Sequence, residues 1–326
     1  MICNALKFSF AVGLIAWMII NGMLDLSSLS VLAKPEYLII FIVLVFLNLG
    51  INNARWNCLL KMNDFHLSNM QTFQLTLIGV FFKFVLPGGV GGDVVKGYYL
   101  VNGSSGRKTI AATTLLMDRL IGMYGMVLVS VVIVLTRFSK IRDQPGLHLL
   151  SAVVVSLFFL ISVFFAMAFS TSIKNHPFVE SVCRNIPGGA LIKRIYDAIH
   201  SYRSNPKVLL QTLILSFISQ FTIILFFWFF AQISGAPNVS FSVYIFVVPL
   251  GLLSTALPVS VAGIGIGQAA LYYLYKLYTG IDSQIGPNAF TAYQIILLCW
   301  GLLGAYLYVT RKTAFKQCVH LDNKMK

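Results

Sequence analysis

The sequence contains few charged residues and very few acidic ones. Charged side chains account for 10% of its 326 residues, and only ten residues are aspartate or glutamate, whereas water-soluble domains carry about 25% charged residues. Hydrophobic residues make up 58% of the chain, and the mean hydropathy is +0.83. This composition excludes a large soluble domain and indicates an integral membrane protein.

Several catalytic and metal-binding patterns are also absent. None of the five cysteines belongs to a C-x-x-C pair, so neither a zinc site nor a disulfide framework is indicated. The five histidines are equally scattered, and there is no D-x-D pair, carboxylate cluster or Ser-His-Asp candidate. A P-loop of the type G-x-x-x-x-G-K-[ST] is missing as well. We therefore expect no metal, no cofactor and no ATP hydrolysis by this chain.

Long apolar stretches dominate what is present. Crossing the hydrocarbon core takes about 20 apolar residues as a helix. Six stretches approach or exceed this length, namely Phe8–Leu24, Tyr37–Leu60, Ile110–Thr136, Leu149–Phe169, Val208–Ile233 and Ala289–Val309. No A-x-A-like cleavage site follows the first stretch, so we expect a retained membrane helix rather than a signal peptide. The predicted fold is an all-α polytopic membrane protein with a single transmembrane domain over residues 1–326.

Basic residues gather in two parts of the chain, which has a net charge of +14. Six Lys or Arg residues lie in Thr171–Lys207, and five lie in the tail after residue 310. Basic loops usually face the cytoplasm and can contact anionic lipid headgroups. No aromatic-basic platform accompanies this charge, so we expect no nucleic-acid binding. We place the chain in the cytoplasmic (inner) membrane, with both termini on the cytoplasmic side.

The basic linker over residues 171–205 contains an amphipathic stretch. Ile192, Ile195, Ile199 and Tyr202 recur at spacings of three and four, so they share one face of a helix. Two arrangements fit this pattern: a helix lying in the membrane interface, or a linker helix packed on the protein's own surface.

Two glycine-containing motifs resemble each other. "LPGGVGGDVVKGYYL" (86–100) is echoed by "LPVSVAGIGIGQAAL" (257–271) at an offset of 171 residues. The same offset relates Pro35 to Pro206, and each proline opens a long apolar segment, where it suits a first helical turn. The shared order of these elements indicates two homologous halves.

The loop charges indicate that the two halves are inverted. If each motif is the tip of a re-entrant hairpin, both basic clusters face the cytoplasm and the repeats 35–136 and 206–310 run in opposite directions. The chain then makes about six crossings and two re-entrant pairs, with eight apolar segments. A smaller cluster of Arg137, Lys140 and Arg142 falls on the outer side. If the helices before the two motifs instead crossed the membrane fully, this smaller cluster would face the cytoplasm and the larger basic cluster in Thr171–Lys207 would face the outside.

The motifs predict a polar site inside the membrane. Proline ends the entering helix, glycines permit a reversal, and irregular backbone at this depth must be covered by protein or a water-filled cavity. A helix that begins near Gly92 would point its free N–H groups at an anion such as phosphate. The candidate lipid- or phosphate-binding residues are Arg55, Lys83, Pro87, Gly88, Gly89, Gly91, Gly92, Asp93, Lys96, Asp118, Arg119, Pro258, Gly263, Gly265 and Gln268.

Simpler roles also fit several of these residues. Asp93 could be only a helix N-cap, the glycines could serve close helix packing, and the lysines could extend to the interface. Asp118 and Arg119 are neighbours on one helix and do not face each other, so each needs a partner elsewhere. Arg119 or Arg55 could meet Asp93 or the ligand. A purely structural ion pair fits equally well.

Four sequence elements together resemble a known family. The two glycine motifs, "ARW" (54–56) and "LLMDRLIG" (115–122) are similar, in the same order, to recurrent elements of the lysylphosphatidylglycerol synthase transmembrane-domain family. That family includes the flippase half of two-part enzymes that make and translocate aminoacylated phosphatidylglycerol, and stand-alone proteins linked to lipid-carried sugars or hopanoids. The resemblance spans nearly the whole chain. It implies two re-entrant hairpins with inverted symmetry and a lipid-translocating role, without fixing the lipid.

The chain departs from the family pattern at two points. Members often carry an arginine–glutamate pair just after the second glycine motif, where this chain has Gly267 and Gln268. If that glutamate handles a cationic headgroup or a proton, this chain is expected to handle neither. The cytosolic aminoacyl-transfer domain of the two-part enzymes is also absent, so we expect no synthesis of lysyl-lipid by this chain.

We therefore expect translocation of a phosphate-bearing membrane lipid, either an anionic phospholipid or a polyprenyl-phosphate carrier. A membrane glycosyl or phosphoryl transferase with a lipid-linked donor is one alternative. A non-catalytic partner of an envelope-biosynthesis enzyme is another, and a homodimer is compatible with the sequence.

Overall fold

The computed structural model describes residues 12–65, 67–86, 91–103, 107–136, 145–174, 189–235, 239–256 and 260–310. Within these ranges it contains helices and no strand, which confirms the predicted all-α class. The elements are η1 (Leu26–Ala33), α2 (Pro35–Met62), α3 (Asn69–Val85), α4 (Gly91–Gly103), α5 (Lys108–Thr136), α7 (Pro145–Phe169), α8 (Thr171–Lys174), α10 (Gly189–His200), η2 (Ser201–Ser204), α11 (Pro206–Ile233), α12 (Phe241–Ser254), α13 (Ile266–Thr279) and α14 (Ile285–Thr310).

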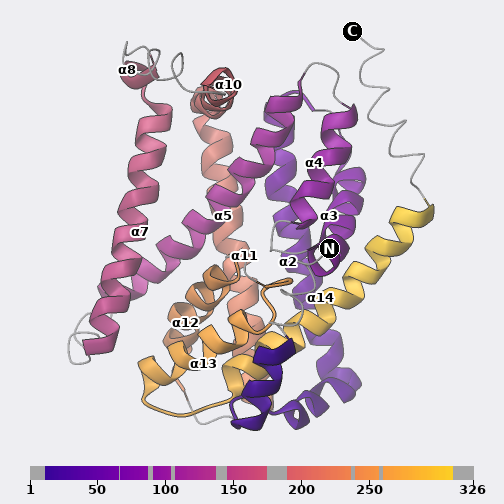
Figure 1. The fold of residues 1–326 in the computed structure, drawn as a ribbon, viewed down its shortest axis with the longest axis vertical. Coiled ribbons are helices and arrows are strands. Elements are labelled where there is room, and N and C mark those ends of the chain that lie inside the picture. The colour runs from indigo at the N-terminus through magenta and orange to yellow at the C-terminus, as the bar shows by residue number, and fades with distance from the viewer. Residues whose placement is uncertain are drawn as a thin grey trace.

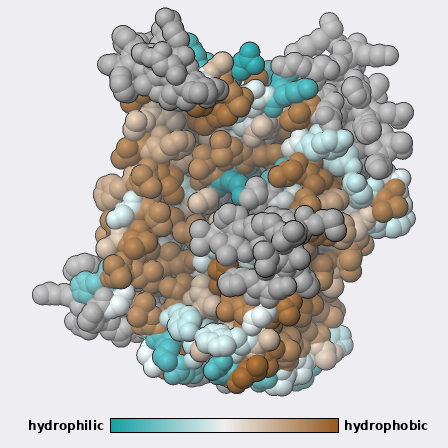
Figure 2. All heavy atoms as spheres, viewed as in Figure 1, coloured by the Kyte–Doolittle hydropathy of each residue, from teal (hydrophilic) through white to brown (hydrophobic). Residues whose placement is uncertain are grey.

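Five of the described helices are long and apolar enough to cross a membrane: α2, α5, α7, α11 and α14. Helix α7 lies at the edge of the bundle (Figure 1) and exposes large apolar side chains such as Leu149, Phe159 and Leu160. Figure 2 shows a mostly hydrophobic face between two ends where hydrophilic residues gather. Lipid is the solvent that suits such a surface, so the chain is a multi-pass membrane protein.

The crossing expected over Phe8–Leu24 lies partly outside the described residues. Residues 12–20 are helical, and Met18 and Leu24 pack in an apolar cluster with Tyr272 of α13. The N-terminal segment therefore contacts the second half of the chain.

Local sequence explains where several helices begin. Pro35 and Pro206 each occupy the first turn of a 28-residue helix, where the missing N–H of proline has no cost. Ser68 and Gln71 form a capping box at α3. The Gln71 N–H donates to Ser68 Oγ at 3.2 Å, and the Ser68 N–H donates to Gln71 Oε1 at 2.8 Å.

Two pairs of shorter helices form hairpins. Helices α3 and α4, of 17 and 13 residues, pack against each other, as do α12 and α13, of 14 residues each. At 1.5 Å per residue these helices are about 20 to 26 Å long, less than the ~30 Å of the hydrocarbon core. In Figure 1, α4 lies in the upper half of the molecule and α12 and α13 lie in the lower half.

The longer helices hold the hairpins together. Helix α2 packs along α11, α3 packs against α14, and α5 packs against α12. At the α2–α11 contact, the buried Asn48 Nδ2 donates to Ser219 O at 2.9 Å, to Ser219 Oγ at 3.0 Å and to Thr222 Oγ1 at 3.1 Å. Hydrogen bonds between helices commonly stabilise helix packing in membrane proteins, so this contact holds α2 and α11 together at the centre of the bundle.

Helix α10 packs on the protein's own surface, which is one of the two arrangements that its sequence left open. Ile199 and Tyr202 are buried in a cluster with residues of α2 and α5, and Ile195 packs against that cluster. At the other end of α10, Leu191 and Ile192 are about half exposed. The helix is thus anchored on the bundle along one face while its first turn presents apolar side chains outward.

Candidate functional site

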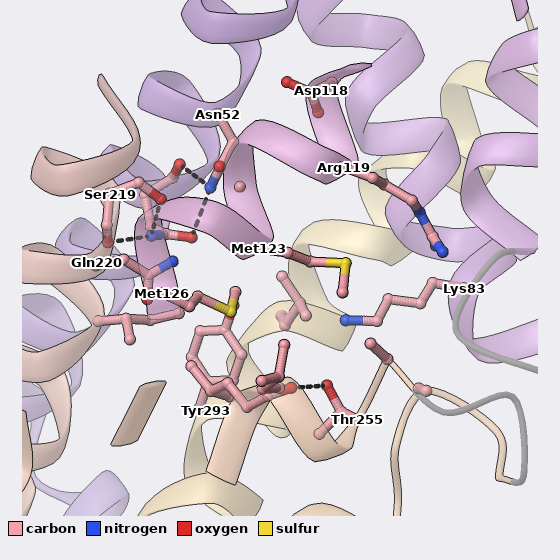
Figure 3. A pocket seen from close by; sticks show the side chains of 18 of the residues that line it. Asn52, Lys83, Asp118, Arg119, Met123, Met126, Ser219, Gln220, Thr255 and Tyr293 are labelled. Atoms are coloured by element: carbon pink, nitrogen blue, oxygen red, sulfur yellow. Dashed lines mark hydrogen bonds between the residues drawn. The ribbon is translucent and has the colours of Figure 1, made fainter. Parts of the chain in front are cut away.

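A cavity of about 250 Å³ lies between α2, α3, α5, α11, α12 and α14 (Figure 3). Its lining mixes charged, amide, hydroxyl and apolar side chains. The polar and charged members are Asn48, Asn52, Arg55, Lys83, Asp118, Arg119, Ser219, Gln220, Thr255, Tyr293 and Gln294. The apolar members include Met123, Met126 and Ile223. An amphipathic lining of this kind suits a ligand with both charged and apolar parts.

Arg55 and Asp118 form a largely buried ion pair at the cavity. Arg55 donates from Nε to Asp118 Oδ1 at 2.8 Å and from Nη2 to Asp118 Oδ2 at 3.1 Å, a bidentate pair. Its Nη1 donates to Ser216 Oγ at 3.0 Å. The Arg55 side chain is 8% exposed and that of Asp118 is 17% exposed. This ion pair joins α2 to α5 and also reaches α11.

A second ion pair links α5 to the first hairpin. Arg119 Nε contacts Asp93 Oδ2, and both side chains are partly exposed. Asp118 and Arg119 are adjacent on α5 yet point in different directions (Figure 3), as expected for neighbours on a helix. Asp93 lies in the first turn of α4, where a carboxylate is favoured by the helix dipole.

Lys83 extends from the last turn of α3 into the cavity, which Met123 also lines (Figure 3). It is close enough to Asp93 and Arg119 for electrostatic interaction. Within the described ranges it forms neither a hydrogen bond nor an ion pair. The Lys83 amine is therefore available to bind a ligand.

The opposite wall of the cavity consists of uncharged side chains from α11, α12, α14 and the turn after α12. Gln294 on α14 lines the cavity and accepts from Gln268 Nε2 at 2.9 Å, while its own Nε2 donates to Ala262 O at 3.2 Å. Gln268 also donates to Thr291 Oγ1 at 3.2 Å. A buried chain of neutral amides therefore connects the tip of the second hairpin to the cavity.

The tip of the second hairpin owes its shape to left-handed backbone. Ala262, Gly263 and Gly265 have φ angles of 51°, 78° and 84°, a region that favours glycine. A side chain on Gly263 would collide with Thr255, because its Cβ would lie 2.5 Å from Thr255 Cβ. The Gly265 N–H donates to Gln268 Oε1 at 2.8 Å. Gly263, Gly265 and Gln268 thus build the tip and do not themselves line the cavity.

The structure brings together some of the predicted site residues and separates others. Arg55, Lys83, Asp118 and Arg119 line the cavity, and Asp93 reaches it through Arg119. Lys96 does not line it; its amine lies over the Trp56 ring, 5.0 Å from the centroid. The candidates outside the described residues are Pro87, Gly88, Gly89 and Pro258.

Gly91 and Gly92 have a packing role in the first hairpin. A Cβ on Gly92 would lie 2.3 Å from the Gly79 carbonyl oxygen, so α3 and α4 approach backbone to backbone. A Cβ on Gly91 would similarly lie 2.4 Å from Leu86 Cβ. These glycines permit the close contact that fixes how α4 is rotated, and that rotation directs Asp93 to Arg119 and Lys96 to Trp56.

Sequence reasoning missed the uncharged polar residues of the cavity. Asn48 and Asn52 on α2, Ser219 and Gln220 on α11, and Gln294 on α14 lie within apolar spans. Intramembrane amides were the available signal, since side chains that hydrogen-bond strongly are expected to face the protein interior rather than lipid. Among the residues that the structure describes, no group of three or more His, Cys, Asp or Glu side chains could hold a metal ion.

Comparison with known proteins identifies the family. The model of the lysylphosphatidylglycerol synthase TM region matches residues 4–304. The chain belongs to this family. The predicted family resemblance is thereby confirmed over nearly the whole chain, and with it the assignment to a membrane domain. No curated protein and no solved structure matches the chain.

Proposed function

We propose that this protein translocates a phosphate-bearing lipid across the membrane, with the lipid headgroup passing through the central cavity. The observation that carries the proposal is the cavity itself. Three cations and two carboxylates meet at a site enclosed by helices of both halves of the chain. An excess of positive charge beside apolar side chains matches a lipid phosphate at the head of an apolar molecule.

The position of these charges supports a transport pathway. Arg55 and Asp118 lie well inside α2 and α5, two of the helices long enough to span the membrane. A charge near the bilayer centre costs about 2.5–3.5 kcal/mol on insertion scales, so such residues commonly mark a substrate or ion pathway. Their mutual ion pair lowers that cost, and the cavity beside them supplies room for water or a headgroup.

The helix arrangement supports the inverted-repeat hypothesis for residues 35–136 and 206–310. Helices α2 and α11 have equal lengths and start 171 residues apart, and Asn48 contacts Ser219 at the same offset. Under this offset, the packing of α3 on α14 corresponds to that of α5 on α12. Two short hairpins on either side of a central cavity are the architecture expected of re-entrant elements in inverted-repeat transporters.

The charges at the two ends of the bundle support the proposed orientation. The end that contains the α2–α3 corner carries Lys61, Arg107, Lys193, Arg194 and Arg203, and hydrogen bonds from Asn63 to Tyr202 and from Arg107 to Asp64 tie this end together. The opposite end, near η1 and the α13–α14 turn, has Lys34 and the ion pair of Lys276 with Asp282, together with Asp25 and Glu36. The basic end is the one we assign to the cytoplasm.

Transport in purified liposomes tests the proposal. The full chain, reconstituted with a fluorescent phosphatidylglycerol or a short polyprenyl phosphate, should move the labelled lipid between leaflets without altering its mass. Arg119→Gln should slow this movement about tenfold or more, because a charge-assisted contact is lost, while the exposed Lys207→Gln on α11 should leave it unchanged. No movement above that of empty liposomes would overturn the proposal. A new covalent lipid product would indicate the transferase alternative instead.

A further inference from the structure

We propose that the cavity selects headgroups with a net negative charge, that Lys83 contacts the headgroup phosphate, and that aminoacylated, cationic headgroups are excluded. This inference rests on the proposed lipid translocation and names the substrate class of the same site. Under this proposal the protein does not carry the lipid in its family's name, because lysylphosphatidylglycerol has two ammonium groups and one phosphate and is a net cation.

Neither carboxylate near the cavity is available for an amine. Asp118 accepts two hydrogen bonds from Arg55, and Asp93 is paired with Arg119. Asp118 also points away from the part of the cavity that Lys83 enters (Figure 3). An incoming ammonium group would have to compete with a guanidinium that is already held in a fixed geometry.

The described residues at the cavity include more cationic side chains than carboxylates. Arg55, Lys83 and Arg119 contribute three positive charges, while Asp93 and Asp118 contribute two negative ones. With the Lys83 amine protonated, the form that a bound phosphate favours, the site is left with one positive charge, and that amine lacks an ion-pair partner within the described ranges. In a medium of low dielectric this charge attracts a phosphate monoanion and repels a cation far more strongly than it would in water.

The wall of the cavity that α11, α12 and α14 form is uncharged among its described residues. The amide on this wall that could contact a headgroup amine is that of Gln294, which is uncharged, and its Oε1 already accepts from Gln268 Nε2 of the second hairpin. Thr255, Tyr293 and Gln220 add hydroxyl and amide groups, which suit phosphate or glycerol oxygens better than an ammonium group.

The experiment compares two labelled lipids in liposomes that contain the full-length protein: phosphatidylglycerol and lysylphosphatidylglycerol. We expect the protein to move phosphatidylglycerol at least about tenfold faster, the ratio that one charge-assisted contact provides. Lys83→Gln should reduce phosphatidylglycerol movement about tenfold, and Lys83→Arg should restore most of it because the positive charge returns. Lys207→Gln, which removes an exposed lysine at the start of α11, is the matched control.

A gain-of-function variant keeps the inference testable if Lys83 variants fold poorly. Gln294→Glu places a carboxylate on the neutral wall and should raise lysylphosphatidylglycerol movement relative to phosphatidylglycerol severalfold. Equal movement of both lipids by the unaltered protein would overturn the charge selection and leave lipid translocation standing. Movement of neither lipid, nor of a polyprenyl phosphate, would overturn both. If neither Lys83→Gln nor Gln294→Glu changes the lipid preference, these two residues do not contact the headgroup, and the proposed role of Lys83 is overturned.

Discussion

The two walls of the central cavity differ in charge although they are formed by corresponding helices of the proposed repeats. The wall from α2, α3 and α5 contains Arg55, Lys83, Asp118 and Arg119, whereas the wall from α11, α12 and α14 contains only uncharged side chains among its described residues. An inverted pair of repeats therefore need not give a symmetric site. The shared packing positions the helices, and one half supplies the charges while the other supplies neutral hydrogen-bonding groups.

The charged wall should be the more sensitive to mutation. Asp118→Asn leaves Arg55 buried with no carboxylate, so we expect the free energy of unfolding to fall by about 3–5 kcal/mol. On the neutral wall, Gln294→Ala removes two hydrogen bonds between uncharged groups and should cost less, about 1–3 kcal/mol. Denaturant titration of both variants in detergent micelles measures the difference. Equal losses would contradict the proposed contrast between the walls.

The two hairpins should differ in their tolerance of a methyl group. In Gly92→Ala the new Cβ meets backbone atoms of Gly79, the nearest at 2.3 Å, while in Gly251→Ala it meets the Leu271 side chain at 2.4 Å. A side chain can change rotamer and a helix backbone cannot easily retreat, so Gly92→Ala should cost about 1–3 kcal/mol and Gly251→Ala less. Thermal unfolding in one detergent would compare them. A larger loss for Gly251→Ala would show that the second hairpin is the more tightly packed.

The partly exposed ion pair should matter less for stability than the buried one. The side chains of Arg119 and Asp93 are 33% and 26% exposed, so water can solvate Arg119 when its partner is removed. We expect Asp93→Asn to lower the unfolding free energy by about 1 kcal/mol or less. The same denaturant titration serves as the measurement, with Asp118→Asn as the reference. A loss as large as that of Asp118→Asn would mean that the Arg119–Asp93 pair is shielded from solvent.

The smallest effect is expected where the two halves meet. Ser219→Ala removes one of three hydrogen bonds from Asn48 and should cost about 0.6 kcal/mol, the average for interhelical hydrogen bonds in membranes. Asn48→Ala removes all three and should cost more. If the two variants lose equal stability, the Asn48 amide contributes to the α2–α11 contact only through Ser219 Oγ.

Much of the helix content could be predicted from the sequence, because a helix that spans a membrane requires a long apolar run, which can be recognised from the sequence alone. The first residues of α2 and α11 could also be predicted, because Pro35 and Pro206 are favoured in the first turn of a helix. The charged candidates Arg55, Asp118 and Arg119 stood out because charge is rare in such runs. These signals depend on single segments and not on how the segments pack.

The partners of these residues depend on packing, and the sequence left them open. That Arg55 binds Asp118 while Arg119 meets Asp93 follows from the rotation and separation of α2, α4 and α5. Lys96 was expected at the site for its nearness in sequence, yet the rotation of α4 places it over Trp56. Neutral residues such as Ser219 carry no distinctive signal, since serine is common in membrane helices.

The size of the cavity limits which part of a lipid can enter it. A volume of about 250 Å³ falls below the range of roughly 300–1,000 Å³ for sites that enclose a drug-sized molecule. A phosphate with its glycerol fits such a space, but two acyl chains do not. The hydrocarbon tails would have to stay in the surrounding bilayer while the head passes, so tail length and unsaturation should have little influence on which lipids are carried.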